Sequence, residues 1–344
     1  MNILVTGAGA LLGQGILRCI RFSDNKYRII TADPNPLSSG NWLGDKAYEI
    51  PMANDHAYVP AIAKIILEEK IDIVLVGTDV ELPKFAQYKT ELESSFPVTI
   101  IVASARVIGI ANDKWLTAEF LRANNFPYPL SALTTDKRSV EKLRQQNGLP
   151  LIAKPVDGAR SVGFEIINTD ERISQLTSYS NNLVIQEYLN DNEGEYTSGC
   201  IVYNGKCKAI VTLKRDLRDG NTYRTYRDAD TAKYDNTIVE VAEKLGVEGP
   251  CNFQFRIKDG KPIIFEINSR FSGTTPIRCF YGFNEVEAFI EYVVNKKEIV
   301  PPVLKEGIVM RAYSDIMVSN EELEEFKDRG SLDKPHSQQY PFRP

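Results

Sequence analysis

The segment Phe265-Glu266-Ile267-Asn268-Ser269-Arg270 decides how this 344-residue chain is interpreted. The apolar residues in and before this segment predict an interior strand, where polar side chains need partners. Glu266 and Asn268 lie two positions apart and point to one face, which Arg270 joins if the strand continues. Mg²⁺ prefers oxygen ligands, usually carboxylates together with nucleotide phosphates. The segment therefore predicts a metal and phosphate site, with Glu266 and Asn268 as ligands and Arg270 beside the reacting phosphate.

Gln254, on the preceding strand, can supply a third oxygen only if the hairpin has the right register. A two-residue loop of Asp259-Gly260 places Gln254 opposite Phe265, on the wrong face. A three-residue loop of Asp259-Gly260-Lys261 places it opposite Glu266. We therefore predict the three-residue loop, with its glycine in a left-handed conformation.

Composition and charge narrow the class of protein. Hydrophobic residues make up 43% and charged residues 25% of the chain, which is typical of a globular protein with two or three domains. The net charge of −5 argues against a nucleic-acid partner. The five cysteines form no CxxC pair, so a zinc site is not expected. We expect a cytoplasmic protein without a membrane partner, because no basic leader or membrane-length apolar run is present.

The order of strand and helix signals predicts an α/β domain followed by an α+β region. Residues 1–104 alternate strands and helices, which favours a parallel sheet covered on both faces. Residues 105–300 contain hairpin signals at Asn204-Gly205 and Asp259-Gly260, which favour antiparallel sheets. A mobile lid is expected at about 120–186. We expect residues 301–344, a strand, a helix and a tail, to pack on the core of the second region.

A glycine loop, Thr6-Gly7-Ala8-Gly9-Ala10-Leu11-Leu12-Gly13, follows the first strand and opens a helix. That context favours anion binding at the helix N-terminus. Asp33 comes twenty residues after Gly13, where an acidic residue can meet a ribose, so an NAD(P)-dependent oxidoreductase is one interpretation. The glycine spacing is one residue longer than in the dinucleotide fingerprint. A tight turn without a cofactor, or a substrate site at Gly9, is therefore also open.

Asp79 and Glu81 follow the next buried strand, at the edge where ligands of such sheets bind. Either can hold a substrate amine or cap the following helix. Together with Asp33 they suggest an amine-bearing substrate near the domain interface.

Basic residues and a second glycine loop suggest phosphate contacts. Lys154 ends a strand and precedes Asp157–Gly163, whose glycines let backbone N–H groups approach phosphate oxygens. Lys114 is a second candidate, although an isolated lysine is more often a solvated surface group. The strand ending Gln186-Glu187-Tyr188-Leu189 can offer backbone groups to an adenine, and Glu195 can accept ribose hydroxyls.

Taken in order, these residues resemble the ATP-grasp superfamily, specifically the branch similar to the carbamoyl-phosphate-synthase large subunit, with a single ATP-grasp unit. The resemblance implies a Rossmann-like pre-ATP-grasp domain and a two-subdomain ATP-grasp fold with antiparallel sheets. It implies ATP and Mg²⁺ (or Mn²⁺) as cofactors. The implied nucleotide contacts are Lys114, Lys154, Gly158, Ser161, Gly163, Gln186, Glu187, Tyr188, Leu189 and Glu195, and the implied metal ligands are Gln254, Glu266 and Asn268.

The resemblance also implies a carboxylate–amine ligase that acts through an acyl-phosphate and releases ADP and phosphate. Arg270, Lys154 and Arg278 are the expected catalytic residues, and Lys214 and Arg215 are expected to contact a small-molecule substrate. A homodimer is compatible with this interpretation. The alternatives are the NAD(P)-dependent oxidoreductase and a non-catalytic nucleotide-binding regulatory protein.

Overall fold

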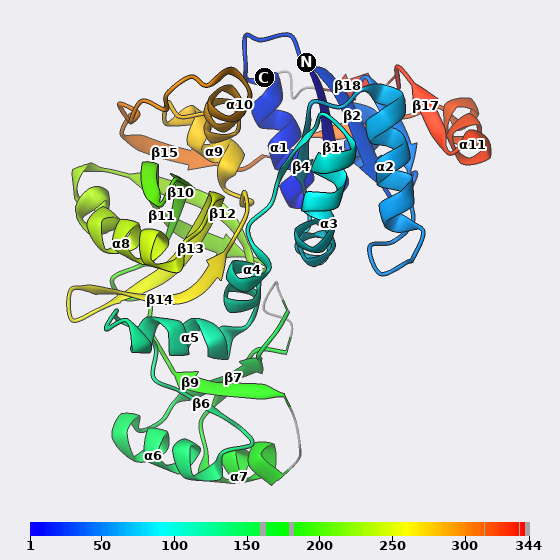
Figure 1. The fold of residues 1–344 in the computed structure, drawn as a ribbon. Helices are drawn as coiled ribbons and strands as arrows, with labels where there is room; N and C mark the ends of the chain where they lie inside the picture. The colour runs from blue at the N-terminus through cyan, green and yellow to red at the C-terminus, as the bar shows by residue number, and fades with distance from the viewer. Residues whose placement is uncertain (159–162, 179–181, 313, 337, 341–344) are drawn as a thin grey trace.

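The computed structural model describes residues 1–158, 163–178, 182–312, 314–336 and 338–340, with the side chains of 338–340 excepted. The described chain forms two six-stranded sheets, a four-stranded sheet and a two-stranded sheet. The N-terminal domain and the large antiparallel sheet lie side by side, and the four-stranded sheet lies below them (Figure 1). This arrangement confirms the predicted fold class.

The N-terminal domain is a parallel sheet with strand order β3-β2-β1-β4-β5. Successive residues of β1 face opposite sides, because strand side chains alternate: Leu4 packs in one hydrophobic core, and Ile3 and Val5 in another. The elements are β1 (Asn2–Thr6), α1 (Leu11–Arg21), β2 (Arg28–Asp33), η1 (Ser39–Leu43), β3 (Lys46–Glu49), α2 (Tyr58–Glu69), β4 (Ile73–Val76), η2 (Asp79–Glu81), α3 (Leu82–Ser95) and β5 (Thr99–Ile101).

Two helices, α4 (Ala105–Asn112) and α5 (Lys114–Ala123), lead into the small subdomain. Its antiparallel sheet has the order β6-β9-β7-β8 and its own hydrophobic core, which includes Val140, Leu151 and Ile185. The elements are β6 (Ser131–Leu133), α6 (Lys137–Asn147), β7 (Leu151–Pro155), β8 (Glu165–Ile167), α7 (Asp170–Ser178) and β9 (Leu183–Glu187). A separate core allows this subdomain to move as a unit.

The large subdomain is an antiparallel sheet with the order β14-β13-β10-β11-β12-β15. Its elements are β10 (Glu195–Tyr203), β11 (Lys206–Arg218), β12 (Asn221–Arg227), η3 (Ala229–Tyr234), α8 (Asp235–Leu245), β13 (Gly249–Lys258), β14 (Lys261–Asn268), α9 (Thr275–Phe280), α10 (Glu285–Asn295) and β15 (Gly307–Met310). The strands β13 and β14 carry the segment quoted at the start.

The β13–β14 hairpin corrects one prediction and confirms another. The turn has two residues, because Lys258 pairs with Lys261, and its residues Asp259 and Gly260 have φ of 51° and 71°. The three-residue loop was therefore wrong. Gln254 nevertheless lies opposite Glu266, as predicted, because a β-bulge shifts the register between Gln254 and the next residue of β13. One extra residue in β14, Phe265, compensates for the shorter turn.

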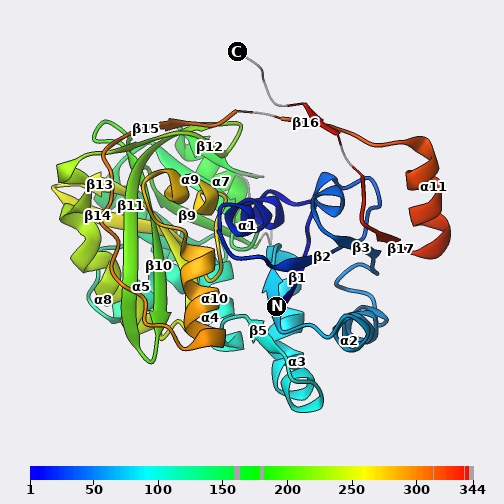
Figure 2. The ribbon, with the colours of Figure 1, turned by 90° about the horizontal axis from the view of Figure 1, so that it is seen from above.

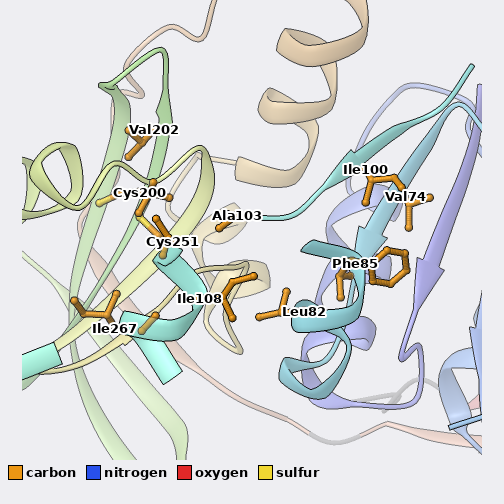
Figure 3. Close-up of a cluster of buried hydrophobic side chains, with 14 of the residues drawn as sticks. Val74, Leu82, Phe85, Ile100, Ala103, Ile108, Cys200, Val202, Cys251 and Ile267 are labelled. Carbon is orange, nitrogen blue, oxygen red and sulfur yellow. The ribbon is translucent and has the colours of Figure 1, made fainter. Parts of the chain in front are cut away.

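Hydrophobic clusters continue from the N-terminal domain into the large subdomain. Figure 3 shows one of them: Val74 and Phe85 belong to the N-terminal domain, Ile108 of α4 lies between the domains, and Cys251 and Ile267 belong to the large sheet. On the other side, α1 lies between the two sheets and packs against α9 and α10 (Figure 2). The cavity described below therefore has two of its walls joined by a common core.

The C-terminal segment is divided between the two domains. β15 pairs with β12 of the large sheet. Beyond β16 (Asp315–Met317), however, α11 (Asn320–Arg329) and β17 (Ser331–Asp333) return to the N-terminal sheet, where β17 pairs antiparallel with β3. The expectation that all of 301–344 packs on the second region is thus too simple, because Phe326 and Leu332 bury against Trp42 and Ala47. β18 (Gln338–Tyr340) pairs with β16.

Among the helices in the described part of the chain, none is long and apolar enough to cross a membrane.

Candidate active site

A cavity of about 620 Å³ lies where the N-terminal domain, the small subdomain and the large subdomain meet. This volume is in the range of small-molecule and cofactor sites. The N-terminal domain contributes the start of α1 and the loop after β4, the small subdomain contributes β7 and β9, and the large subdomain contributes β10 to β14. Segments distant in the sequence therefore share one site.

A continuous chain of hydrogen bonds and ion pairs runs along the large-sheet wall of this cavity. Its members are Asp79, Arg270, Asn268, Glu266, Gln254, Arg215, Glu195 and Arg256, in that order. We call this set the polar chain. It connects the N-terminal domain to the hinge between β9 and β10.

The centre of the polar chain is the carboxylate of Glu266. Its Oε1 accepts from Gln254 Nε2 at 3.2 Å and from Asn268 Nδ2 at 3.1 Å. Asn268 Oδ1 accepts from Arg270 Nη2 at 2.8 Å, and Arg270 makes a bidentate pair with Asp79, with distances of 2.7 and 2.9 Å. The predicted metal ligands are therefore brought together, and Arg270 lies at their N-terminal-domain end.

The other end of the polar chain is held by two arginines. Arg215 Nη2 donates to both Gln254 Oε1 and Glu195 Oε1, each at 2.6 Å. Arg256 Nη2 donates to Glu195 Oε2 at 2.8 Å, and its Nη1 donates to the carbonyl of Leu189. Arg215 was predicted to be a substrate contact, but it joins the metal set to Glu195.

The charged members of the polar chain alternate in sign along it: Asp79, Arg270, Glu266, Arg215, Glu195 and Arg256. Neutral amides separate Glu266 from the arginines on either side. Since these charges compensate one another, any net attraction for an anion must come from other residues of the cavity.

Lys154 and Lys114 supply that additional positive charge. Lys154 is only 8% exposed, and desolvation lowers its pKa from 10.5 to about 8 despite the opposing effect of Glu266. Desolvation also lowers the pKa of Lys114, whose Nζ donates to the carbonyl of Gly158 at 2.8 Å. Both lysines are close enough to Glu266 for its charge to affect their pKa values, Lys114 from the start of α5 and Lys154 from β7, and both line the cavity.

The end of β9 and the two residues after it bring Gln186, Glu187, Tyr188 and Leu189 to the cavity wall. Glu187 is buried, and its carboxylate already has protein partners: it accepts a hydrogen bond from the Leu130 N–H and forms an ion pair with Lys258. Gln186 donates to Ser131 Oγ at 2.7 Å, while its buried Oε1 has no hydrogen-bond partner within the described residues. A buried acceptor without a partner is costly, which fits a ligand that donates to it.

The second glycine loop lies only partly within the described residues. Gly158 lines the cavity with φ of 106°, and Gly163 has φ of 75° at its other end. Ser161, a predicted phosphate contact, lies outside the described residues.

The first glycine loop is filled by the protein itself. A Cβ on Gly9 would lie 2.2 Å from Ser38 Oγ, and one on Gly40 would lie 1.8 Å from the carbonyl oxygen of Ala8. Asp33 accepts from the Gly9 N–H and from Ser38 Oγ, at 2.9 and 2.6 Å. The segment around η1 covers the glycine loop and Asp33 hydrogen-bonds to it. The loop therefore offers no free surface for the pyrophosphate of a dinucleotide, which argues against the NAD(P) interpretation.

Glu81 is a buried carboxylate that hydrogen-bonds within the protein, and it does not reach the cavity as a substrate contact would. It is 3% exposed and accepts hydroxyl hydrogen bonds from Thr6, Tyr58 and Thr78, at 3.0, 2.6 and 2.7 Å. Burial raises its pKa. These bonds fix the loop that presents Asp79, which does line the cavity.

Arg278 and Lys214 do not line the cavity among its described residues. Arg278 is fully buried and pairs with Glu285, while its Nη2 donates to Asn252 Oδ1 at 2.7 Å and to Thr274 Oγ1 at 3.0 Å. It therefore positions residues of the wall, and the expectation that it is catalytic is corrected. Lys214 lies against Gly194 of the hinge loop.

Several wall residues were missed from the sequence, among them Asn252, Arg256 and Arg311. Asn252 and Arg256 flank Gln254 at two-residue spacing on β13, so strand periodicity could have identified them. Arg311 comes from the segment after β15, and no local signal marks it.

Within the described residues, no group of three or more His, Cys, Asp or Glu side chains could hold a metal ion. A metal here would therefore depend on Glu266, on the amide oxygens of Gln254 and Asn268, and on ligand oxygens. Few protein ligands together with substrate phosphates suit Mg²⁺, so the residues fit that ion.

Three family models match parts of the chain. The PylC-like N-terminal domain matches residues 3–101, and the model described as ATP-grasp in the biosynthetic pathway with Ter operon matches residues 179–316. The tubulin-tyrosine ligase family matches residues 119–191.

Curated relatives include carbamoyl phosphate synthase large chains. That of Caldanaerobacter subterraneus subsp. tengcongensis is 25% identical over 327 residues, which is 86% of this chain and 29% of the relative. That of Thermoplasma acidophilum is 22% identical over 335 residues, which is 88% of this chain and 32% of the relative. The chain thus spans about a third or less of the length of these relatives.

Solved structures share the fold at low identity. N5-carboxyaminoimidazole synthetase from Staphylococcus aureus, complexed with ADP, has a TM-score of 0.68 at 15% identity and covers 95% of this chain and 84% of its own. The biotin carboxylase domain of the Hydrogenobacter thermophilus 2-oxoglutarate carboxylase, in complex with MgADP, ADP and bicarbonate, has a TM-score of 0.70 at 13% identity, with coverages of 99% and 83%.

Residues 3–101 of the chain therefore match a PylC-like N-terminal domain and residues 179–316 match an ATP-grasp domain, and the chain is similar over most of its length to carbamoyl phosphate synthase large chains.

Proposed function

We propose that this protein is an ATP-dependent carboxylate–amine ligase that forms an acyl-phosphate and releases ADP and phosphate. The observation that carries the proposal is the cavity that Glu266, Gln254 and the buried cation of Lys154 line together, with Asn268 hydrogen-bonded to Glu266. An anion offsets the cost of keeping a buried lysine charged, and a single carboxylate with two amides needs further oxygens to hold a metal. A magnesium–nucleoside triphosphate supplies both.

In this proposal the adenine lies at the hinge and the ribose beside Glu195. The unpartnered Oε1 of Gln186 accepts from the exocyclic amino group of adenine, and the backbone of Glu187 to Leu189 contacts the ring edge. Each Glu195 oxygen already accepts two hydrogen bonds, Oε1 from Arg215 and Oε2 from Arg256. A ribose hydroxyl that donates to Glu195 would therefore take the place of one of these arginine N–H groups. Lys114, Lys154 and the Gly158 loop contact the phosphates.

Glu266, Asn268 and Gln254 would hold the metal, which supplies positive charge to the phosphate oxygens. The amide groups of Gln254 and Asn268 now turn their N–H groups to Glu266 and their oxygens to arginines. Rotation of each amide by half a turn would present its oxygen to a metal bound at Glu266. The same rotation would turn the amide N–H groups towards Arg215 and Arg270, so these arginines would have to find other acceptors.

The reaction consists of two displacements. A carboxylate oxygen of the first substrate attacks the γ-phosphorus, the bond to the β,γ-bridging oxygen breaks, and ADP leaves. The amine nitrogen then attacks the acyl carbon, and phosphate leaves as the amide forms. The contribution of the protein is to position the reactants, stabilise charge with Lys154 and Arg270, and exclude water when the small subdomain closes.

The experiment that tests this proposal is trapping of the acyl-phosphate. The protein is incubated with MgATP, hydroxylamine and a panel of carboxylic acids, and hydroxamate and phosphate are measured; bicarbonate is included for phosphate release alone. We expect at least one acid to give both products, and Glu266→Gln to abolish them. Tight ATP binding without turnover on any acid would favour a regulatory protein, and binding of NADH would favour an oxidoreductase.

A further inference from the structure

The pair between Asp79 and Arg270 joins the N-terminal domain to the metal-binding strand. The residues are 191 positions apart, and the pair is bidentate, with N–O distances of 2.7 and 2.9 Å. Both side chains line the cavity, with 34% of Asp79 and 12% of Arg270 exposed. The pair is therefore accessible to a ligand that enters from this side.

The two partners differ in how they are held. Asp79 lies on a loop that Glu81 anchors through three buried hydroxyl groups, and Gly77 packs so closely that a Cβ there would lie 2.3 Å from the Thr6 carbonyl oxygen. Arg270 has further acceptors, Asn268 Oδ1 and the Phe271 carbonyl oxygen, at 2.8 and 3.1 Å. Asp79 is thus a fixed carboxylate, whereas Arg270 can exchange it for another anion.

We infer that Asp79 is the binding site for a protonated amine substrate, and that the ammonium group replaces Arg270, which then turns to the phosphate. This inference rests on the proposed ligase function and extends it to the class of the second substrate and to the order of events. The exchange conserves charge, because one cation replaces another on Asp79 and an anionic phosphate replaces Asp79 on Arg270. Because each charge keeps a partner after the exchange, no unpaired charge is left at the cavity wall.

In this exchange, the charge of Arg270 becomes available to the phosphate only when the amine substrate is bound. Without the amine, Asp79 neutralises Arg270 at the edge of the metal set, so its charge is withheld from the transferring phosphoryl group. With the amine bound, Arg270 is released, and an aliphatic amine or amino acid is favoured over a neutral nucleophile. In the second displacement the ammonium group first gives one proton to a phosphate oxygen of the acyl-phosphate, and the neutral amine nitrogen then forms the amide bond as the acyl–oxygen bond breaks. The second proton of the amine also passes to the leaving phosphate, which departs as dihydrogen phosphate.

The test compares Asp79→Asn with the wild-type protein on an acid that yields hydroxamate. Hydroxylamine is neutral at pH 7.5 and needs no carboxylate for binding. Methylamine, ammonia and the α-amino groups of the common L-amino acids are protonated at this pH, and these compounds serve as the amine probes. Amide products are measured by mass spectrometry. We expect the ratio of amide to hydroxamate to fall about 10- to 100-fold in Asp79→Asn, through a higher KM for the amine, as for loss of a charge-assisted contact. Asp79→Glu should restore part of it.

A second readout follows the released arginine. In the wild-type protein, the cationic amine should increase phosphate release, and in Asp79→Asn phosphate release without amine should be higher and no longer respond to amine. Asp170→Asn is the matched control, because Asp170 forms a bidentate pair with Arg144 outside the cavity, with distances of 2.6 and 3.2 Å.

An unchanged product ratio and amine response in Asp79→Asn would overturn the inference while leaving the ligase function intact. Absence of both hydroxamate and amide from the wild-type protein, with every acid and every amine probe, would overturn both.

Discussion

Replacement of Lys154 by methionine should make the ligand-free protein more stable at neutral pH while weakening its binding of nucleotide. Desolvation lowers the pKa of this lysine from 10.5 to about 8 in the folded protein. Each tenfold change in the acid dissociation constant corresponds to about 1.4 kcal/mol, so retaining the charge costs the folded state about 3 kcal/mol. Methionine is unbranched and of similar length, and it fills the site without that cost.

The pH dependence distinguishes this effect from a change in packing. Below pH 8 the lysine is protonated in both folded and unfolded states, and the full cost applies. Between pH 8 and 10.5 the unfolded chain binds more protons than the folded one, so wild-type stability rises with pH. The advantage of Lys154→Met should therefore be about 3 kcal/mol at pH 7 and vanish by about pH 10.5.

Scanning calorimetry at several pH values is the assay. We expect Lys154→Met to raise the Tm by roughly 3–6 °C at pH 7, given the size of the chain. Lys142→Met is the matched control, because Lys142 is an exposed lysine on α6 of the same subdomain. An advantage that does not depend on pH, or a loss of stability at pH 7, would refute the assignment of Lys154 as a buried cation kept for a ligand.

Two further predictions concern the large subdomain. Arg215→Met should weaken MgADP binding at least about tenfold and reduce the benefit of Mg²⁺, because Arg215 holds both Gln254 and Glu195. Arg256 contacts Glu195 but not Gln254, so Arg256→Met should weaken ADP binding without changing the effect of Mg²⁺. Calorimetric titration of ADP with and without Mg²⁺ distinguishes the two variants. If both variants changed the Mg²⁺ effect equally, the roles given to the two arginines would be contradicted. Gly260→Ala should lower the free energy of unfolding by about 1 kcal/mol, because the φ of Gly260 is 71° and strain is the only cost where no atom lies within 4 Å of the added Cβ. Gly109→Ala on helix α4 should raise the free energy of unfolding by up to about 1 kcal/mol, because alanine favours a helix more than glycine does. Denaturant unfolding measures both changes. The same sign for both would contradict this reasoning.

The sequence predicted the two-domain architecture and the central ligands because both depend on local periodicity. Glu266 and Asn268 share a strand face at a spacing of two, and β1 and β4 read as buried parallel strands. The turn at Asp259-Gly260 was predicted incorrectly because the bulge at Phe265 has no local signal. Two errors in register, the shorter turn and the bulge, cancel, so the pairing of Gln254 with Glu266 was right for the wrong reason.

Long-range pairing accounts for what could not be predicted. Glu81 and Asp79 look alike in sequence, yet Glu81 meets Thr6 and Tyr58 in the interior and Asp79 meets Arg270 across the cavity. Whether a carboxylate is an anchor or a contact with ligand depends on which distant residues the fold brings to it.

The most direct test of the central claim, that the Glu266 strand holds the metal of a bound nucleotide, is calorimetric titration of ADP into wild-type and Glu266→Gln protein, with Mg²⁺ and with EDTA. We predict that Mg²⁺ increases ADP affinity at least about tenfold in the wild-type protein, and that Glu266→Gln removes this increase while leaving the affinity in EDTA largely unchanged. If Glu266→Gln retained the Mg²⁺ effect, or if the wild-type protein lacked it, the metal site would not lie on this strand.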